Sequence, residues 1–401
     1  MRQTRAAYVW TRVLDTPFWG LFNLLPFILY KDLHASPFEI GLLVTIKPVV
    51  SIFSSYWSST FHNKPERLVG SIIWARWIAY LPFFLYPFIH NIWFILASFG
   101  LFMSLQVGMM PAWMELLKKH LPLQNREKIF SYTQAFGYLG GGLLPFLFGW
   151  VLDEWLGAWR WMFPLAAALA LGATFWQRKI HLETRDTPQA QLPDEFLLHP
   201  WKNAWNVLTQ HPLFLKFQIG FTLLGSGLMV MQTTLPIFFV DELHLSYTEL
   251  GIAMALCKGL GFACSSPLWA RLMQQLDIFR FMAWVALLAT AFPLLLLLAK
   301  WQMAWLFGAF FLYGFMQAGS ELGWNLSGPR FAERHDSTPF SSVNILAVGV
   351  RGLFIPSLGA LLLSHYGSLF TIILSSCLCL FSALRMRTYA LHIQPSKGVV
   401  N

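Results

Sequence analysis

The sequence predicts an all-α integral membrane protein with twelve transmembrane helices in two pseudo-symmetric six-helix bundles. Its composition, its recurring apolar segments and an internal repeat lead to this prediction. Hydrophobic residues make up 56% of the 401 residues and charged residues only 12%. Ordinary soluble domains are roughly 25% charged, so most of this chain is expected to face hydrocarbon.

Apolar segments of about 20 residues, long enough to cross a bilayer, recur along almost the whole chain. We predict spans at 8–30, 38–59, 68–89, 92–117, 129–152, 160–176, 213–240, 247–272, 278–299, 302–325, 339–364 and 368–387. The polar segment 177–212 separates six spans from the next six. It is expected to be a cytoplasmic linker between bundles at 1–176 and 213–401, with a short amphipathic helix near 197–208 on the inner leaflet.

An internal repeat supports this division into two halves. Residues 25–41 read LPFILYKDLHASPFEIG, and residues 235–251, 210 positions later, read LPIFFVDELHLSYTELG, with seven of seventeen pairs identical. A second block, at an offset of 211, aligns Gln106 with Gln317 and Pro145 with Pro356. A repeat of half the chain indicates duplication and fusion, with any shared site at the seam.

The distribution of Lys and Arg predicts the orientation. Nineteen lie on the side that both termini share, against three on the other side, Lys31, Arg160 and Lys300. This bias places both termini in the cytoplasm, in a multi-pass protein of an inner or plasma membrane. The net charge of +9 is then a topology signal. No basic stretch is interleaved with aromatic residues on a polar segment, so no nucleic-acid partner is expected.

The chain resembles the major facilitator superfamily over essentially its whole length. The resemblance rests on the twelve spans, the two parallel halves and the charged linker, and on three local segments: SPFEIGLL, HLPLQNREKIFSYTQAFGYLGGGLLP and GAWRWMFP. It implies alternating access, in which two halves rock about a central cavity. The loop after span two departs from the family pattern and keeps only Lys64 and Arg67, whereas the loop after span eight is nearer to it.

Candidate gating and hinge residues follow from these loops and from matched prolines and glycines. They are Pro26, Pro236, Gly141, Pro145, Gly352, Pro356, Arg271, Asp277 and Arg280. Small residues let membrane helices approach closely, and a proline bends a helix and frees a carbonyl. Packing and hinging are the favoured roles of the glycines, and direct solute contact is the alternative. The span-five glycines loosely resemble those of exporters.

Ionisable residues inside spans are candidates for the transport pathway, because charge in hydrocarbon is costly unless partnered. In the first half, Arg12, Asp15, Trp19 and Asn23 lie on one face of span one. Asp15 is the first candidate for a protonatable or cation-binding site, and an internal Arg12–Asp15 pair is the alternative. Lys47 lies near the middle of span two, where either a structural partner such as Asp15 or an anionic solute would explain it.

In the second half the deep charged residues are Lys258, Glu321 and Arg351. The other candidates there are Gln232, Gln317 and Asn325. Gln317 and Asn325 share a helix face with Glu321, and Gln317 is expected to face Gln106 across a cavity. The charges of Glu321 and Arg351 have no counterpart in the first half. This asymmetry is expected of a solute or ion site and not of a scaffold that both halves share. A gate-side ion pair between these two residues is the alternative.

Together these features predict a secondary active transporter of a small solute. It would be a monomer without cofactor or metal, working by a rocker-switch mechanism and coupled to protons through Asp15 and Glu321. The deep cations favour an anionic or zwitterionic solute, while the aromatics and span-five glycines suit efflux of amphipathic compounds. A transporter-like receptor without flux is the first alternative. A polytopic membrane enzyme is the second and less favoured alternative. His181 and Asp186 form an H-x4-D pattern of the acyltransferase type, but this pattern lies in the polar linker without the expected hydrophobic setting, so chance explains it better.

Overall fold

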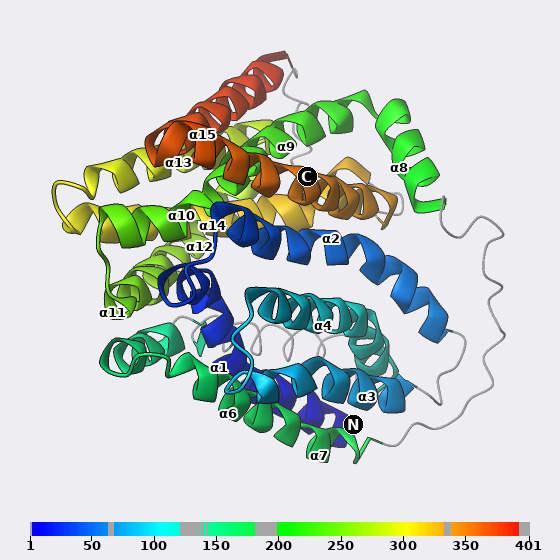
Figure 1. Cartoon of the computed structure of the whole chain (residues 1–401). Helices are drawn as coiled ribbons and strands as arrows, with labels where there is room; N and C mark the ends of the chain where they lie inside the picture. The colour runs from blue at the N-terminus through cyan, green and yellow to red at the C-terminus, as the bar shows by residue number, and fades with distance from the viewer. Residues whose placement is uncertain are drawn as a thin grey trace. The chain divides into compact units, whose positions relative to one another are not determined.

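The computed structural model describes residues 2–62, 68–120, 137, 140, 141, 143–180, 199–332 and 338–392 (Figure 1). Within these ranges the secondary structure is entirely helical, which confirms the predicted fold class. Lys64, Arg67, the loop at 121–136 and the greater part of the linker lie outside the described residues. The number of twelve spans stays a prediction.

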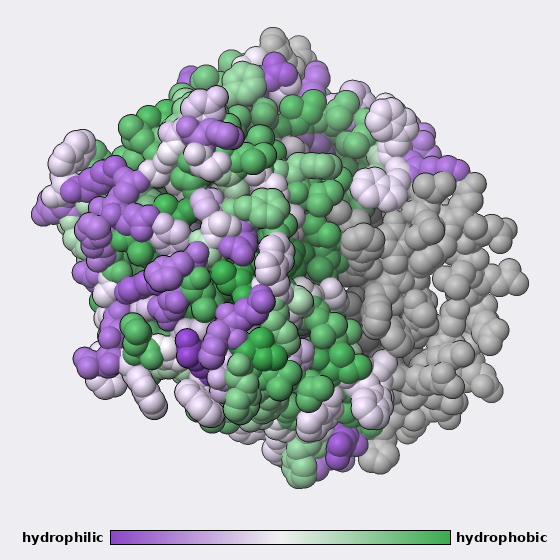
Figure 2. All heavy atoms as spheres, in the orientation of Figure 1, coloured by the Kyte–Doolittle hydropathy of each residue, from purple (hydrophilic) through white to green (hydrophobic). Residues whose placement is uncertain are grey.

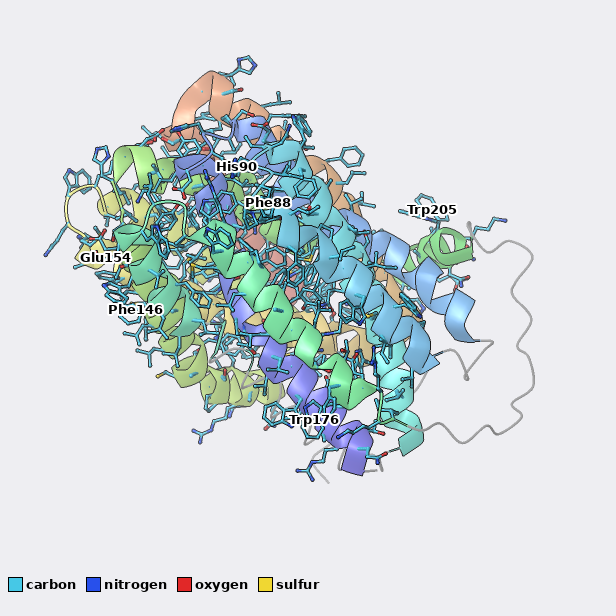
Figure 3. All side chains as sticks on the ribbon, turned by 60° about the horizontal axis from the view of Figure 1, so that its bottom comes forward. Phe88, His90, Phe146, Glu154, Trp176 and Trp205 are labelled. Carbon is cyan, nitrogen blue, oxygen red and sulfur yellow. The ribbon has the colours of Figure 1, made fainter. Side chains whose placement is uncertain are left out.

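The first half of the sequence forms helices of very different lengths. They are α1 (Arg2–Lys31), α2 (Pro37–His62), α3 (Leu68–Tyr80), η2 (Leu81–Leu85), α4 (Ile92–His120), α6 (Trp159–Gly172) and α7 (Thr174–Gln177). Residues 143–154 are helical as well. Figure 3 shows Phe88 and His90 on the link between η2 and α4.

The second half begins with α8 (His199–Gln210), the helix expected near 197–208. It continues with α9 (Pro212–Gln232), α10 (Thr234–Ile237), η3 (Phe238–Glu242), α11 (Tyr247–Gly251), η4 (Ile252–Cys257), α12 (Lys258–Gln275), α13 (Ile278–Leu298), α14 (Ala304–Ala332) and α15 (Thr338–His392). Gly367, with φ of 79°, interrupts α15 between the predicted spans 339–364 and 368–387. Glycine tolerates this left-handed backbone because it has no Cβ.

Five helical stretches of the described part are long and apolar enough to cross a membrane. They are Gln3–Lys31, Pro212–Glu242, Tyr247–Gln275, Ile278–Leu298 and Val343–Leu391. The first four coincide closely with predicted spans. Large apolar side chains are exposed on many helices, for example Trp74 at 71% and Leu156 at 88%. On the face drawn in Figure 2 hydrophobic residues cover broad areas, and many hydrophilic ones gather toward the left edge. Such a surface suits a lipid environment.

Contacts divide the chain into two compact units that differ from the predicted halves. Unit 1 comprises Met1–Leu197 and Pro236–Leu256, and unit 2 comprises Leu198–Leu235 and Cys257–Asn401. The predicted boundaries at 176 and 213 stay a prediction. The core of unit 1 is aromatic: Phe18 is fully buried, and its ring contacts Phe22, Tyr80 and Phe83 at centroid distances of 4.7, 4.8 and 4.7 Å.

Except for Leu235, both copies of the short repeat lie in unit 1, and they share their backbone geometry. His34 and His244 adopt left-handed conformations with φ of 53° and 51°. Next, Ser36 and Ser246 cap the following helices: each hydroxyl accepts a bond from a Glu backbone N–H three residues later, and that Glu accepts one from the Ser backbone. These capping boxes satisfy amides that the helix leaves unpaired. The identical residues therefore specify one way of joining two helices.

Candidate functional site

A buried ion pair lies inside unit 1. Asp15 of α1 is 5% exposed and Arg76 of α3 is 1% exposed. Both guanidinium Nη atoms of Arg76 donate to the Asp15 carboxylate, with the Nη1 bond at 3.1 Å. The Tyr80 hydroxyl adds a bond to Asp15 at 2.8 Å. Charges taken out of water need this kind of bidentate, hydrogen-bonded geometry to be tolerated.

The pair is tied to two further helices. Arg76 Nε and Nη2 both donate to the Ala170 carbonyl of α6, at 3.1 and 2.7 Å. Gln106 of α4 donates to the Tyr80 hydroxyl at 3.3 Å. The sequence predicted Asp15 and Gln106 as candidates, but it pointed neither to Arg76 nor to Tyr80. Arg12, the alternative partner of Asp15, instead lies over the Tyr8 ring at 5.5 Å.

Asn23 and Gly141, two other candidates, form a hydrogen bond that the position of Pro145 makes possible. A proline has no N–H, so Pro145 leaves the carbonyl of Gly141, four residues earlier, without its helical partner. The Asn23 side chain donates to this carbonyl at 3.3 Å. Trp19, one turn before Asn23, contacts Phe22 and Phe102 edge-on and belongs to the aromatic core.

Unit 2 places a polar row along α14. Tyr313, Gln317, Glu321 and Asn325 recur every four residues and so share one helix face. Gln317 Nε2 donates to Glu321 Oε1 at 3.4 Å, and Asn325 donates to the Glu321 carbonyl at 2.9 Å. Lys258 of α12 lies over the Tyr313 ring at 5.0 Å. The expected grouping of Gln317, Glu321 and Asn325 is therefore present.

Arg351 of α15 occupies a separate place in unit 2. It is 9% exposed, and its Nη1 donates to the Phe221 carbonyl of α9 at 3.0 Å. Among the described residues it forms no ion pair, so the alternative pairing with Glu321 is not present.

The remaining candidates are distributed over several elements. Lys47 of α2 is exposed, and Gln232 lies at the end of α9. Asp277 caps α13 by accepting from the Phe279 and Arg280 amides, and its carboxylate pairs with Arg280 at 3.1 Å. Arg271 is exposed on α12, and Pro26, Pro236, Gly352 and Pro356 lie within helical stretches. No group of three potential metal ligands occurs in the described ranges.

Three carboxylates at helix ends of unit 1, each bonded to a residue distant in the sequence, were not predicted. We call Asp32, Asp153 and Asp241 the carboxylate cluster. Asp153 ends the helical segment 143–154, which carries Phe146 and Glu154 (Figure 3), and it accepts bonds from the Tyr247 and Thr248 amides at 2.9 and 2.8 Å. Lys31 Nζ lies 3.9 Å from Asp153. The partners come from distant parts of the sequence, so spacing along the chain could not reveal them.

The other two carboxylates of the cluster bond to tyrosines. Tyr247 donates to Asp32 at 2.9 Å, and Tyr30 donates to Asp241. Burial raises the pKa of the Asp32 carboxyl above its usual range, although the Tyr247 hydroxyl and the nearby Lys31 act in the opposite direction.

Helices with apolar outer surfaces and paired charges in their interior are typical of polytopic membrane proteins that carry polar solutes. A family model described as Major Facilitator Superfamily matches residues 13–345. The chain therefore belongs to the Major Facilitator Superfamily, and it is a multi-pass membrane protein and a secondary transporter of small solutes. The family resemblance and the transporter function predicted above are confirmed.

Solved structures share this fold at low sequence identity. A POT family transporter in complex with 5-aminolevulinic acid is 11% identical, with a TM-score of 0.75 over 98% of this chain and 96% of that one. A bacterial homologue of the iron transporter ferroportin, in an inward-facing state, is 13% identical, with a TM-score of 0.72 over 97% and 99%. A peptide transporter POT in complex with sulfate is 12% identical, with a TM-score of 0.74 over 97% and 94%. No curated protein sequence matches significantly.

Proposed function

We propose that this transporter works by alternating access and couples solute movement to protons through Glu321. The observation that supports this choice is a difference in exposure between two carboxylates. Asp15 is 5% exposed and bonded to a guanidinium, whereas Glu321 is only partly buried on the polar row of α14. A carboxylate that carries protons has to be reached from water in at least one state, and Glu321 meets this condition.

Asp15, the first candidate from the sequence, has a different role in this proposal. Protonation of Asp15 would leave the Arg76 guanidinium buried without its counter-charge, which is strongly unfavourable. Asp15 and Arg76 therefore hold α1 against α3 and α6 throughout the cycle. Glu321 accepts a bond from Gln317, a polar side chain that can exchange hydrogen bonds as the carboxyl gains or loses a proton.

Flux into proteoliposomes tests this proposal. The probe is the first radiolabelled compound, from a panel of carboxylic acids, amino acids, sugars and nucleosides, that enters proteoliposomes faster than protein-free liposomes. An imposed pH gradient is expected to drive its accumulation by wild-type protein. Glu321→Gln should keep exchange of the probe but lose gradient-driven accumulation. Glu154→Gln, which changes an exposed carboxylate, should behave as wild type.

Two outcomes separate this proposal from its alternatives. Gradient-driven accumulation by Glu321→Gln equal to that of wild type refutes the coupling role of Glu321. Binding of a panel compound without any movement supports the receptor alternative, and formation of a new product in detergent supports the enzyme alternative. We further propose an inner or plasma membrane location with both termini in the cytoplasm, on the basis of the Lys and Arg distribution.

A further inference from the structure

Arg351 introduces a positive charge into the interior of unit 2 that no described carboxylate balances. The residue is 9% exposed, and its Nη1 donates a hydrogen bond to the Phe221 carbonyl at 3.0 Å. The guanidinium also lies 5.5 Å from the centroid of the Phe221 ring. A carbonyl and a ring face offset only part of the cost of burying a charge, so a further partner is expected.

One edge of the guanidinium carries a buried donor that has no hydrogen-bond partner in the described part of the chain. The bond to Phe221 uses Nη1, and the opposite edge is formed by Nε and Nη2. Nε is buried, and it has no hydrogen-bond partner within the described ranges. The N–H groups of this edge are parallel and match the two oxygens of a carboxylate, a geometry that an ammonium group cannot reproduce.

Gly225 leaves the space that the guanidinium of Arg351 occupies. It lies on α9, one turn after Phe221, and a Cβ added to it would overlap the terminal atoms of Arg351. Only a residue without a side chain leaves this space. The orientation of Arg351 is therefore set by α9 on two sides, through the Phe221 carbonyl and through the absence of a side chain at Gly225.

The polar side chains two turns away bond to one another and leave the charge of Arg351 unbalanced. Gln218 and Asn344 lie seven residues before Gly225 and Arg351, and Gln218 Nε2 donates to Asn344 Oδ1. Asn344 Nδ2 donates to Ser327 Oγ at 2.9 Å. All three side chains are neutral. The missing negative charge therefore has to come from outside this group.

We propose that Arg351 binds a carboxylate of the transported solute side-on, through Nε and Nη2, so that the solute is an organic anion or carries an anionic group. This assignment rests on the transporter function and names the chemical class of its substrate. It does not depend on proton coupling through Glu321. Phe221 and Gly225 act as positioning residues for the guanidinium.

Ligand-induced thermal stabilisation of the purified full chain in detergent tests the proposal. The probes are acetate, lactate, succinate, glutamate and benzoate, each compared with its amide, together with phosphate and sulfate. At least one carboxylate should raise the unfolding temperature while its amide does not. Arg351→Gln and Arg351→Lys should each lower the affinity for that carboxylate by about tenfold or more, because a charge-assisted bidentate contact is lost.

Glycine variants separate binding from a purely structural role. Gly225→Ala leaves the charge of Arg351 in place but displaces the guanidinium. In this variant the carboxylate should no longer raise the unfolding temperature. Gly308→Ala is the matched control, since an added Cβ meets nothing within 4 Å there, and its response should equal that of wild type.

Four results would overturn the assignment. In the first, no carboxylate binds the wild type. In the second, phosphate or sulfate binds in preference to every carboxylate. In the third, Arg351→Gln lowers the unfolding temperature of the free protein but responds to the carboxylate as the wild type does, which indicates a purely structural arginine. Accumulation of a neutral solute in proteoliposomes would also refute it, while leaving the transporter function and the role of Glu321 intact.

Discussion

The two units differ in how the charge of a buried arginine is balanced. In unit 1, Arg76 is paired with Asp15 and bonded to Tyr80 through that carboxylate. In unit 2, Arg351 has a backbone carbonyl and a ring face, and no described carboxylate. The repeat makes this comparison specific, because at offsets of 210 and 211 Asp15 corresponds to Gly225 and Gly140 corresponds to Arg351.

Each charge in these matched positions therefore has a glycine as its counterpart. Arg76 itself corresponds to Ala286 at the offset of 210, so unit 2 lacks both members of the pair found in unit 1. Removing one partner of a buried pair is strongly unfavourable, whereas a charge without a counter-charge gains most when an anion arrives. The comparison supports the proposals made above, in which the first site is structural and the second binds an anion.

Breaking the ion pair of unit 1 should produce the largest effect on stability. Asp15→Asn leaves the Arg76 guanidinium buried without a counter-charge and should lower the free energy of unfolding by about 3–5 kcal/mol. Reversible unfolding in mixed micelles measures this change. Asp15→Asn combined with Arg76→Gln should recover part of the loss.

Arg280→Gln provides the matched control, because it removes an exposed pair with Asp277. It should cost no more than about 1 kcal/mol. A loss of that small size for Asp15→Asn as well would mean that Asp15 and Arg76 do not stabilise unit 1.

Filling the two matched glycine positions should separate packing from binding. Gly140→Ala would bring a Cβ onto the Thr16 side chain and should cost about 1–3 kcal/mol of stability, as expected of overpacking. Thr16 is neutral, so carboxylate binding should be unchanged in this variant, in contrast to Gly225→Ala. The same thermal measurements with and without carboxylate distinguish the two, and a loss of binding in both variants would remove the difference between the units.

The two capping boxes should respond alike, because both copies of the short repeat have the same geometry. Ser36→Ala and Ser246→Ala should each lower the free energy of unfolding by about 0.5–2 kcal/mol through the loss of a helix cap. Ser104→Ala serves as the control, since Ser104 is exposed and bonds to the Gly100 carbonyl of its own helix. An effect at one copy alone would show that the repeat is not a shared structural unit.

The smallest expected effect concerns pH and the Asp32 carboxyl in the first copy of the short repeat. Burial raises the pKa of Asp32 in the folded protein, so the folded state binds more protons than the unfolded state above the usual value of 3.8. Stability due to this group is therefore present at low pH and is lost as pH rises through the folded pKa. Asp32→Asn should flatten this part of the stability curve, and an unchanged slope in micelle unfolding would contradict the assignment to Asp32.

Much of the fold was predictable because the length of a hydrophobic segment that crosses a bilayer is set by the thickness of the hydrocarbon core. The spans at 8–30 and 278–299 coincide closely with helices, and the repeat anticipated the matched helix ends. The site was predictable only in part. Asp15 stands out as an acidic residue in an apolar span, but its partner lies 61 residues away.

Arg76 carries a signal in the sequence. It is a lone arginine inside the apolar stretch SIIWARWIAYLP, where a charge needs a partner. Pairing across helices depends on how the helices are rotated, which periodicity leaves undetermined. The carboxylate cluster was missed for the same reason, since its members come from helix ends far apart in the sequence.

The carboxylate cluster also bears on how distant segments of unit 1 are joined. Asp153 accepts bonds from the first two amides of the helix that starts at Tyr247 and that Ser246 caps, and tyrosines donate to Asp32 and Asp241. Hydrogen bonds to charged groups contribute about 1.5–3 kcal/mol each, roughly twice the value for neutral pairs. All four bonds join residues at least 94 positions apart in the sequence, so the cluster fixes how these helix ends of unit 1 meet.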